Sequence, residues 1–314
     1  MRDEGLVDCD EPFERLLCQG MVNAESFYLK DGGRTEWIAP DKVRVERDDK
    51  GKATAAFHKD TGQPLEFGGV IKMSKSKNNG VDPEYVVREY GADTIRLFSM
   101  FAAPPEQSLE WTDSGVEGAS RFIKKLWRNV HLHIAAGEPG DLIVDALNSE
   151  HKDLRRKTHE TIKKVSDDFG RRQTFNTAIA AVMELLNEVG KLADRATPQG
   201  LAVEREALES AVLMLCPIIP HACHALWQAL GRGENLLDAP WPKVDEDALE
   251  KASVLIIAQV NGKVRSRLEL PANVSKEDIE AAALKDENVQ KFIDGQTIRK
   301  VIVVPGKLVN IVAN

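Results

Sequence analysis

The stretch Lys72-Met73-Ser74-Lys75-Ser76 is followed by Lys77 and then by Asn78-Asn79-Gly80. We refer to residues 72–77 as the lysine loop, because a segment with no apolar face to bury is predicted to be an exposed, mobile, cationic loop. Such a loop suits a polyphosphate, since each ammonium group is a movable positive charge and each serine hydroxyl can donate a hydrogen bond to a phosphate oxygen. A solvated lysine-rich turn is the alternative for a short motif taken alone, so the neighbouring sequence decides.

Helix signals follow the lysine loop. Asp82 is a good N-cap, Pro83 stands at the first helical position and Gly91 is placed to end this helix. A second short helix is predicted over residues 93–101, before two prolines. Residues 71–112 are therefore expected to form one segment that carries the lysine loop and two short helices.

Longer helical patterns come next, and they predict an antiparallel bundle over residues 113–242 with short connecting loops. Pro217 and Pro220 are expected to break the last helix. The expected helices lie near residues 113–136, 146–168, 174–196 and 201–230.

The sequence before the lysine loop has two parts. Residues 26–70 predict a small β-rich insertion, because strand-like stretches flank Asp31-Gly32-Gly33-Arg34, which is a hairpin signal. Residues 1–25, with a short helix expected at 11–18, are too few to bury their own apolar side chains. We therefore expect them to be the end of a larger domain.

The tail changes character after a linker at residues 243–252. Asn261-Gly262 is the strongest short hairpin signal in the chain, and Ser275 is placed to cap a helix. Residues 253–314 therefore predict a compact ββαββ domain, which makes the expected fold class multidomain α/β plus all-α. Its elements are expected at residues 254–260, 263–270, 275–284, 287–293 (a helical turn), 298–304 and 308–312.

Composition restricts the class of protein. The chain has 314 residues, 42% of them hydrophobic, enough for about two or three domains. No apolar run approaches the ~20 residues that span a bilayer, and no apolar segment of a signal peptide follows the charged start. The four cysteines lack C-x-x-C spacing, so we expect a reduced, cytoplasmic protein without a zinc site or a membrane partner.

The formal net charge of −8 argues only weakly against nucleic acid as a partner, because the basic residues cluster. At helical spacing, one side of the helix expected from Asp113 is basic and the other is apolar. A solvated face is the alternative, although four like charges repel one another unless phosphates neutralise them. The basic side is Arg121, Lys124, Lys125 and Arg128, and the apolar side is Phe122, Ile123, Leu126, Trp127 and Val130.

A second basic cluster follows Asn261-Gly262. Period-two alternation predicts that Lys263, Arg265 and Arg267 lie on one face of a strand. They would either protect an edge strand by charge or form a small face for an RNA backbone, and the sequence leaves both open.

Other candidate sites are expected to be structural. The segment 220–224, with two histidines, Cys223 and nearby Cys216, lacks a second Cys/His pair, so a metal site is not expected. No Ser-His-Asp or Cys-His set is evident. We expect Asp167, Asp168, Glu204 and Glu206 to be surface carboxylates, and His131 and His133 to lie at the surface or rim of the bundle.

These motifs resemble those of class I aminoacyl-tRNA synthetases. Residues 72–83 resemble the signature loop of that class, and residues 90–98, Tyr-Gly-Ala-Asp-Thr-Ile-Arg-Leu-Phe, look like its stem-contact segment. Further features are similar to bacterial leucyl-tRNA synthetases: the β-rich insertion directly before the loop, which looks like their leucine-specific domain, and the stretches at residues 171–179, 260–265 and 304–307. The resemblance covers essentially the whole chain.

The chain also departs from that family's pattern. The His-x-Gly-His signature that holds ATP is absent, as are the first half of the nucleotide-binding fold, the editing domain and the zinc modules. The resemblance is therefore to the C-terminal third of such an enzyme, with residues 1–25 as the end of a Rossmann-like catalytic domain. On this basis the isolated chain is expected to be inactive.

The resemblance implies an activity and site residues. The family activates leucine with ATP and Mg²⁺ to leucyl-adenylate and transfers it to tRNA(Leu). Lys72 and Lys75 would be catalytic, because they would stabilise the charge on the departing pyrophosphate, with Lys75 expected to have the larger effect. Met73, Ser74 and Ser76 would join them in binding the ATP phosphates. Both basic clusters and the bundle, of anticodon-binding type, would contact tRNA(Leu), and the protein would be a monomer.

Two other interpretations remain open. The chain could be a stand-alone tRNA-binding protein of synthetase ancestry without catalysis. It could also be a relative of the valyl, isoleucyl or methionyl enzymes, which the β-rich insertion before the loop and the lack of C-x-x-C pairs disfavour.

Overall fold

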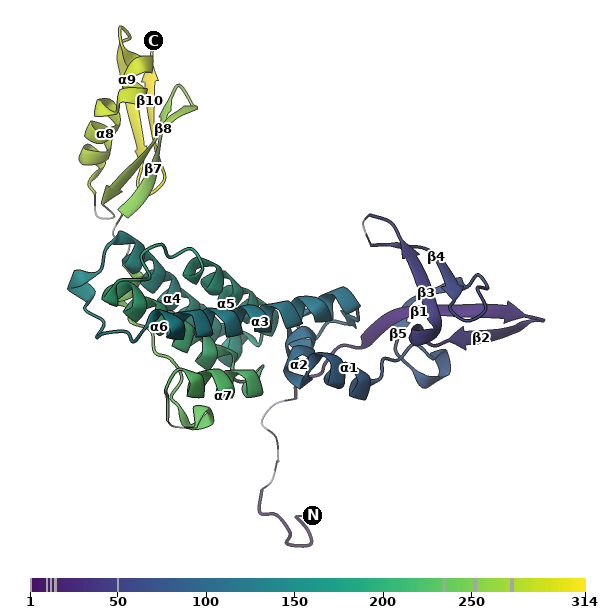
Figure 1. The fold of residues 1–314 in the computed structure, drawn as a ribbon. Helices are drawn as coiled ribbons and strands as arrows, with labels where there is room; N and C mark the ends of the chain where they lie inside the picture. The colour runs from purple at the N-terminus through teal and green to yellow at the C-terminus, as the bar shows by residue number, and fades with distance from the viewer. Residues whose placement is uncertain are drawn as a thin grey trace. The chain divides into compact units, whose positions relative to one another are not determined.

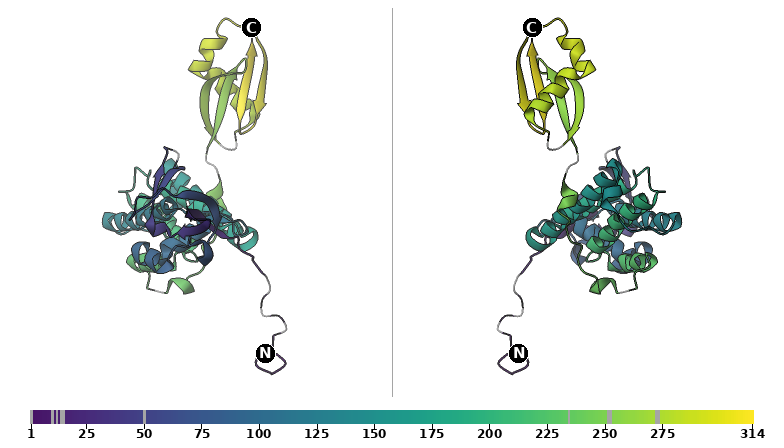
Figure 2. Two further views of the ribbon diagram at one scale, coloured as in Figure 1. Left: turned by 90° about the vertical axis from the view of Figure 1, so that its right-hand side faces the viewer. Right: turned by 90° about the vertical axis from the view of Figure 1, so that its left-hand side faces the viewer.

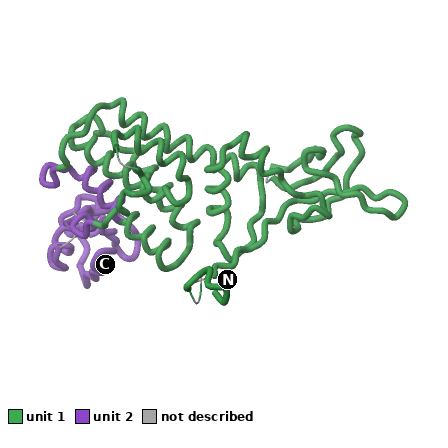
Figure 3. The backbone as a smooth tube through the Cα atoms, turned by 90° about the horizontal axis from the view of Figure 1, so that it is seen from below, with its two compact units in different colours: residues 1–142, 160–244 green, residues 143–159, 245–314 purple. Residues whose placement is uncertain are grey.

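The computed structural model describes residues 2–9, 11, 13, 16–49, 51–233, 235–250, 253–271 and 274–314 (Figure 1). It divides into two compact units, which Figure 3 distinguishes by colour. Unit 1 contains residues 1–142 and 160–244, and unit 2 contains residues 143–159 and 245–314. The protein is thus a mixed α/β structure with several sheets and many helices.

The β-rich part of unit 1 contains two small sheets. β1 (Val22–Asp31) lies between β2 (Arg34–Ile38) and β5 (Glu66–Lys72), both antiparallel to it, and β6 (Leu109–Glu110) pairs with β1 in parallel. β3 (Val43–Arg47) and β4 (Ala53–His58) form a separate hairpin. The predicted turn between β1 and β2 is confirmed, and Gly32 and Gly33 both have positive φ, which the two-residue turn requires. Four buried side chains form the core of this part: Phe27, Ile38, Val43 and Ala56.

The strands extend beyond the predicted insertion at residues 26–70. β1 begins at Val22 and β5 ends at Lys72, so the sheet contains the first residue of the lysine loop. The expected helix at residues 11–18 lies partly outside the described residues, and residues 11, 13 and 16–18 are in no helix. The domain boundaries given above remain predictions.

Two short helices follow the lysine loop, as predicted. α1 (Pro83–Tyr90) begins after Asp82, whose side chain accepts a hydrogen bond from the Glu84 backbone N–H. Gly91, with φ +85°, ends α1 and precedes α2 (Ala92–Phe101). Only glycine adopts that backbone angle without strain, so this residue sets the turn between the two helices.

The helical part contains α3 (Asp113–Ala136), α4 (Ser149–Asp167), α5 (Phe175–Val189), α6 (Pro198–Leu215) and α7 (Pro220–Ala229). The predicted break near the two prolines is confirmed, because α6 ends at Leu215 and α7 begins at Pro220. A π-helical turn (Asp168–Arg172) joins α4 to α5. Among the fully buried side chains of this core are Leu126, Ile162, Ile179, Leu185, Leu208 and Met214.

The break between α6 and α7 is held by two side chains of α2. Asp93 Oδ2 accepts a hydrogen bond of 2.7 Å from the backbone N–H of Ala222, in the first turn of α7. Arg96 donates to the carbonyl oxygens of Pro217 and Ile218, at 2.9 and 2.8 Å. Because helix ends leave backbone donors and acceptors without intrahelical partners, this pair of opposite charges satisfies both sides of the break.

Unit 2 contains one four-stranded sheet in the order β8-β7-β10-β9, with β10 parallel to β7 and the other pairs antiparallel. Figure 2 shows the two helices on one face of it. The turn at Asn261-Gly262 is confirmed, with both residues at positive φ. The second helix is a full helix capped by Asp286, where only a helical turn was predicted. The elements are β7 (Ser253–Val260), β8 (Lys263–Pro271), α8 (Lys276–Lys285), α9 (Glu287–Ile293), β9 (Ile298–Val304) and β10 (Leu308–Ala313).

Three polar residues expected at the surface are buried instead. Asp168 and His133 are fully buried, and Glu204 is 1% exposed. Glu204 accepts from His133 Nδ1 at 3.0 Å and pairs with Arg195 at 3.1 Å, so the carboxylate is compensated by partners that the sequence does not place near it. The predictions for these three residues are wrong, whereas His131 is exposed, as expected.

Asp168 joins α4 to α5 through hydrogen bonds. Its carboxylate accepts from Lys164 (2.8 Å), Arg172 (3.0 Å), Thr174 (3.0 Å) and Thr177 (2.6 Å). Burial acts to raise the pKa of Asp168, but the hydrogen bonds from Lys164, Thr177 and Thr174 outweigh it and hold the pKa below its usual value.

We expect Asp168→Ala to lower the free energy of unfolding of the chain by about 3 kcal/mol, because it removes the shared acceptor of a buried ionic cluster. Urea denaturation of the purified chain measures this. The matched control is Asp167→Ala, which removes the neighbouring carboxylate bonded to exposed Arg171 and should change stability little. Equal losses in the two variants would contradict the assignment.

The lowered pKa of Asp168 also gives a pH dependence. The stability contribution of the ionised carboxylate is fully present above the unfolded-state pKa of about 3.9 and is lost as the pH falls through the lower folded-state pKa. The difference in unfolding free energy between the unaltered chain and Asp168→Asn should therefore shrink below about pH 4. A difference that stays constant into this acidic range would show that the charge of Asp168 does not stabilise the fold.

Candidate functional site

The lysine loop leaves the sheet at the end of β5. The backbone N–H of Met73 still donates to the Val22 carbonyl at 2.9 Å. The chain then forms one 3-10 turn (Lys75–Lys77), which ends at Asn78 in the left-handed conformation with φ 48°. The loop is thus a short, hydrogen-bonded turn attached to a strand, more regular than the sequence predicts.

Asn79 closes the loop at its base. Its side chain is buried, and its Oδ1 accepts a 3.0 Å hydrogen bond from the Ser74 backbone N–H. Its Nδ2 lies 3.3 to 3.5 Å from the carbonyl oxygens of Ala24, Ile71 and Lys72. One amide therefore connects the returning end of the loop to both β1 and β5.

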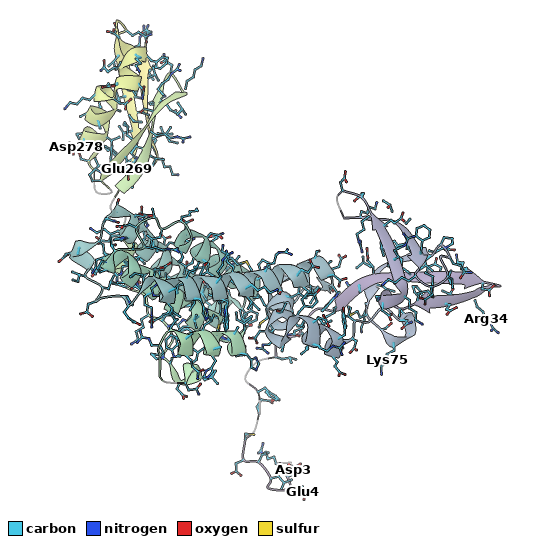
Figure 4. All side chains as sticks on the ribbon, in the orientation of Figure 1. Asp3, Glu4, Arg34, Lys75, Glu269 and Asp278 are labelled. Carbon is cyan, nitrogen blue, oxygen red and sulfur yellow. The ribbon has the colours of Figure 1, made fainter. Side chains whose placement is uncertain are left out.

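The lysines of the loop differ in their surroundings. Lys72 and Lys75 are exposed, and their ammonium groups form no hydrogen bond or ion pair within the part of the chain that the structure describes. Lys75 projects outward from the ribbon (Figure 4). Lys77 is half-buried, with Nζ 4.2 Å from the centroid of the Trp37 ring. Two of the three lysines are therefore available to an anion.

The serines lie beside these lysines. Ser74 Oγ and Ser76 Oγ are 3.2 Å apart, and Ser76 is exposed. Two ammonium groups and two hydroxyl groups within one turn can together donate to several phosphate oxygens. The geometry is thus compatible with the predicted phosphate-binding role of Lys72, Met73, Ser74, Lys75 and Ser76, which remains a prediction.

Cys223 of α7 and Cys216, which precedes it, are buried, and His221 pairs with a side chain of α2. His221 Nδ1 lies 2.9 Å from Asp93 Oδ1. Burial raises the pKa of Cys223 well above its usual value, and burial followed by the charge of Asp93 raises that of Cys216, so both thiols stay protonated near neutral pH. Among the described residues, no group of three or more His, Cys, Asp or Glu side chains could hold a metal ion.

The basic side of α3 is exposed, with one exception. Arg121, Lys124 and Arg128 are exposed, and Arg121 lies 3.6 Å from Glu117. Lys125 is half-buried and donates to the side chain of Asn187. Three of the four predicted cations therefore remain accessible on one helix.

Trp127 was predicted to lie on the apolar side of α3, and this prediction is wrong. It is 41% exposed, and its ring stacks on His131 with centroids 4.9 Å apart. At 100° per residue, position 127 falls at the border between the apolar and basic sides. The result is an aromatic pair beside the basic residues.

The predicted basic face of β8 is also wrong. The pairing of β8 with β7 is interrupted by a β-bulge, where the register shifts between Ala258 and Gln259 of β7. Lys263 of β8 pairs with Val260 of β7, and Arg267 pairs with Ile257. Directly paired residues share a face, and Val260 is buried under the helices while Ile257 is partly exposed. Lys263 and Arg267 therefore lie on opposite faces, because a bulge shifts the period-two alternation by one residue.

Arg265 lies on the helix side of that sheet. Its guanidinium carbon is 3.6 Å from the centroid of the Phe292 ring in α9. The three basic residues of β8 therefore do not form one surface.

Sequence reasoning missed two residues of the site, Trp37 and Asn79. Trp37 lies in β2, 35 positions before Lys72 in the sequence, and no local pattern indicates that its ring meets the loop. The stretch Asn78-Asn79-Gly80 signals a turn, but the burial of Asn79 depends on strands that are distant in the sequence. Both contacts arise from tertiary structure.

Comparison with known families and proteins gives consistent matches. The family described as "Anticodon-binding domain of tRNA ligase" matches residues 151–281, and the family "tRNA synthetases class I (I, L, M and V)" matches residues 68–112. The first match begins within α4 and ends within α8, so it does not include α3. The second match contains the lysine loop, α1 and α2.

Individual relatives match the chain over its whole length. The leucine–tRNA ligase of Cellvibrio japonicus is 66% identical over 314 residues, and that of Chromohalobacter salexigens is 63% identical over 315 residues. Both alignments cover 100% of this chain but only 36% and 37% of the relative. The chain thus spans about a third of the length of the curated relatives it matches.

A solved structure agrees. The crystal structure of the ternary complex of Agrobacterium radiobacter K84 agnB2 LeuRS, tRNA and LeuAMS has a TM-score of 0.63 and 28% sequence identity. The match covers 78% of this chain and 31% of that one. In sequence, this chain is therefore homologous over its whole length to a C-terminal part of leucine–tRNA ligases, and 78% of it matches the fold of the solved LeuRS structure.

Proposed function

We propose that the chain is the part of a leucine–tRNA ligase that supplies the lysine loop and tRNA-binding surfaces. The observation that carries this proposal is the 66% identity over all 314 residues with a protein of that name. Lys72 and Lys75, whose ammonium groups have no hydrogen-bond or ion-pair partner among the described residues, agree with it, because the reaction of such a ligase splits a nucleotide. The complete enzyme would activate leucine with ATP and esterify tRNA(Leu), acting as a monomer in the cytoplasm.

Lys72 and Lys75 would act on the charge that develops during activation. When the α-phosphate is attacked by the leucine carboxylate, negative charge grows on the departing pyrophosphate. The ammonium groups of Lys72 and Lys75, which have no partner among the described residues, can stabilise this charge without first breaking another contact. Ser74 and Ser76 would donate to the phosphate oxygens, and the backbone at Met73 would keep the loop attached to β5.

Mg²⁺ bound with ATP would neutralise part of the phosphate charge. The residues of the lysine loop are cations and hydroxyl groups, which are poor ligands for a hard cation compared with carboxylates. We therefore assign no Mg²⁺ ligand to this loop.

The described residues also include no helix long and apolar enough to cross a bilayer.

In the complete ligase, Lys75→Ala should slow leucine-dependent ATP–pyrophosphate exchange by about 100-fold, the usual effect of removing one donor to a developing charge. The KM for leucine should stay unchanged, because the contact belongs to the phosphates. The matched control is Lys52→Ala, which removes an exposed lysine from the turn between β3 and β4. A rise in leucine KM that accounts for the whole loss would place Lys75 in ground-state binding and contradict the proposal.

The tRNA surfaces would lie in both units. The family match at residues 151–281 supports tRNA as a partner, and the similar solved structure is a ternary complex that contains tRNA. Arg121, Lys124 and Arg128 would contact the phosphate backbone from α3, while Lys125, bonded to Asn187, would contribute less. In unit 2, Lys263, Arg265 and Arg267 would act from separate faces and not as one surface.

We expect the affinity of the chain for tRNA(Leu) to fall steeply between about 50 and 200 mM salt. The double variant Lys124→Ala/Arg128→Ala should reduce the slope of log affinity against log salt by about 1.5, since each lost phosphate contact removes about 0.7 to 0.9. The control is Arg171→Ala, because both guanidinium contacts of Arg171 go to Asp167. Titrations that show a flat salt response, or the same slope in the double variant, would exclude α3 as the contact.

A further inference from the structure

One lysine of the loop is bound to the β-rich insertion. Lys77 Nζ lies over the face of the Trp37 ring, 4.2 Å from its centroid, and the Trp37 carbonyl oxygen accepts a 3.2 Å hydrogen bond from Asn78 Nδ2. A single residue of β2 therefore holds the last residue of the lysine loop through its ring and the residue that follows the loop through its backbone carbonyl.

The ring of Trp37 is itself fixed in place. A Cβ atom on Gly68 would lie 2.6 Å from Cζ3 of Trp37, so the ring packs directly on the bare backbone of β5. Tyr28 packs against the same ring, with centroids 5.1 Å apart. The backbone of β5 beside Gly68 is held to β1 by a hydrogen bond of 2.8 Å that the Ser26 hydroxyl donates to the Gly69 carbonyl oxygen. A β-bulge lies at the same place, between Ser26 and Phe27 of β1.

These contacts divide the loop into held and free parts. Asn79 fixes its base through the Ser74 N–H, and Trp37 fixes its far end through Lys77 and Asn78. Lys75 is left exposed between the two fixed points, and the exposed Lys72 stands just before them at the end of β5, where it pairs with Asn23 of β1.

We propose that Trp37 is a positioning residue for the lysine loop: its ring and carbonyl oxygen hold Lys77 and Asn78, and thereby orient Lys75 toward a polyphosphate, beside Lys72, which β5 holds. The inference rests on the proposed function, because it assigns the polyphosphate to ATP. It adds a role for the insertion, because Trp37 lies in its strand β2. Lys77 is a structural cation and not a phosphate ligand.

The size of the effect follows from the contact. A cation over the face of an indole ring contributes about 1 kcal/mol at a partly exposed site, and a loss of that size corresponds to about a fivefold change in rate. A loop without the contact has to be ordered when the nucleotide binds, so the cost appears in adenylate formation and not in leucine binding.

The test compares variants of the complete ligase in leucine-dependent ATP–pyrophosphate exchange. Trp37→Leu and Lys77→Met should each lower the rate by about fivefold with the leucine KM unchanged, and the double variant should be no slower than either single one. Lys77→Arg and Trp37→Phe should retain most of the rate, because each keeps a cation over an aromatic ring. The matched control is Arg44→Met, which removes a similar contact with Phe57 (4.9 Å) elsewhere in the insertion and should leave the rate unaltered.

A second measurement reports on the loop directly. Amide hydrogen exchange at residues 74–79 of the chain should be faster in Trp37→Leu and in Lys77→Met, and unaltered in Arg44→Met. If Trp37→Leu does not fold, the amide exchange of residues 74–79 in Lys77→Met, compared with Lys77→Arg and Arg44→Met, still decides, because a lysine that only bound phosphate would leave the loop of the free chain unaltered. Additive losses in the double variant would mean that Lys77 acts on phosphate by itself, and unaltered rates in both single variants would mean that the contact positions nothing; either result overturns the proposal.

The two proposals fail separately. If Lys75→Ala slows the exchange but the Trp37 and Lys77 variants do not, only the positioning role is lost. If Lys75→Ala has no effect, the proposed function of the loop fails, while the hydrogen-exchange result still shows whether Trp37 holds it.

Discussion

The buried amide of Asn79 is the constraint on which the candidate site depends. A loop that leaves the end of a strand would ordinarily have to be ordered at the cost of its conformational entropy. Here the returning residue donates toward carbonyl oxygens of β1 and β5 and accepts from Ser74, so both ends of the loop share one anchor. An amide suits this position because it offers a donor and an acceptor on one rigid plane, whereas an aspartate at position 79 would offer no donor to the carbonyls.

A second constraint connects the segment after the loop to the helical part. Asp93 and Arg96 stand one turn apart on α2 and face the two sides of the break between α6 and α7. Residues 90–98 resemble a segment that contacts the tRNA stem, yet these two charges bind protein backbone. Their place in such a motif is therefore explained by the geometry of the broken helix.

Local signals in the sequence predicted the elements well, and long-range contacts account for the errors. Asp82 before Pro83, and Asn261 before Gly262, are caps and turns whose chemistry lies within a few residues, and both form as expected. The burial of Asp168 depends on Thr177 and Lys164 meeting across a helix junction, which no periodicity indicates. The bulge near Arg265 similarly depends on β7, and it reverses a face assignment that alternation alone supports.

The lysine loop shows the same limit within six residues. Composition treats Lys72, Lys75 and Lys77 as equivalent cations, and a short motif cannot rank them. The fold separates them. Lys77 contacts the ring of Trp37, which lies in β2, far from it in the sequence, while Lys72 and Lys75 contact no acceptor among the described residues. A contact that engages one cation lowers the number of free like charges in the loop. The functional part of such a motif is therefore set by what the surrounding structure leaves unpaired as much as by the residues that the motif contains.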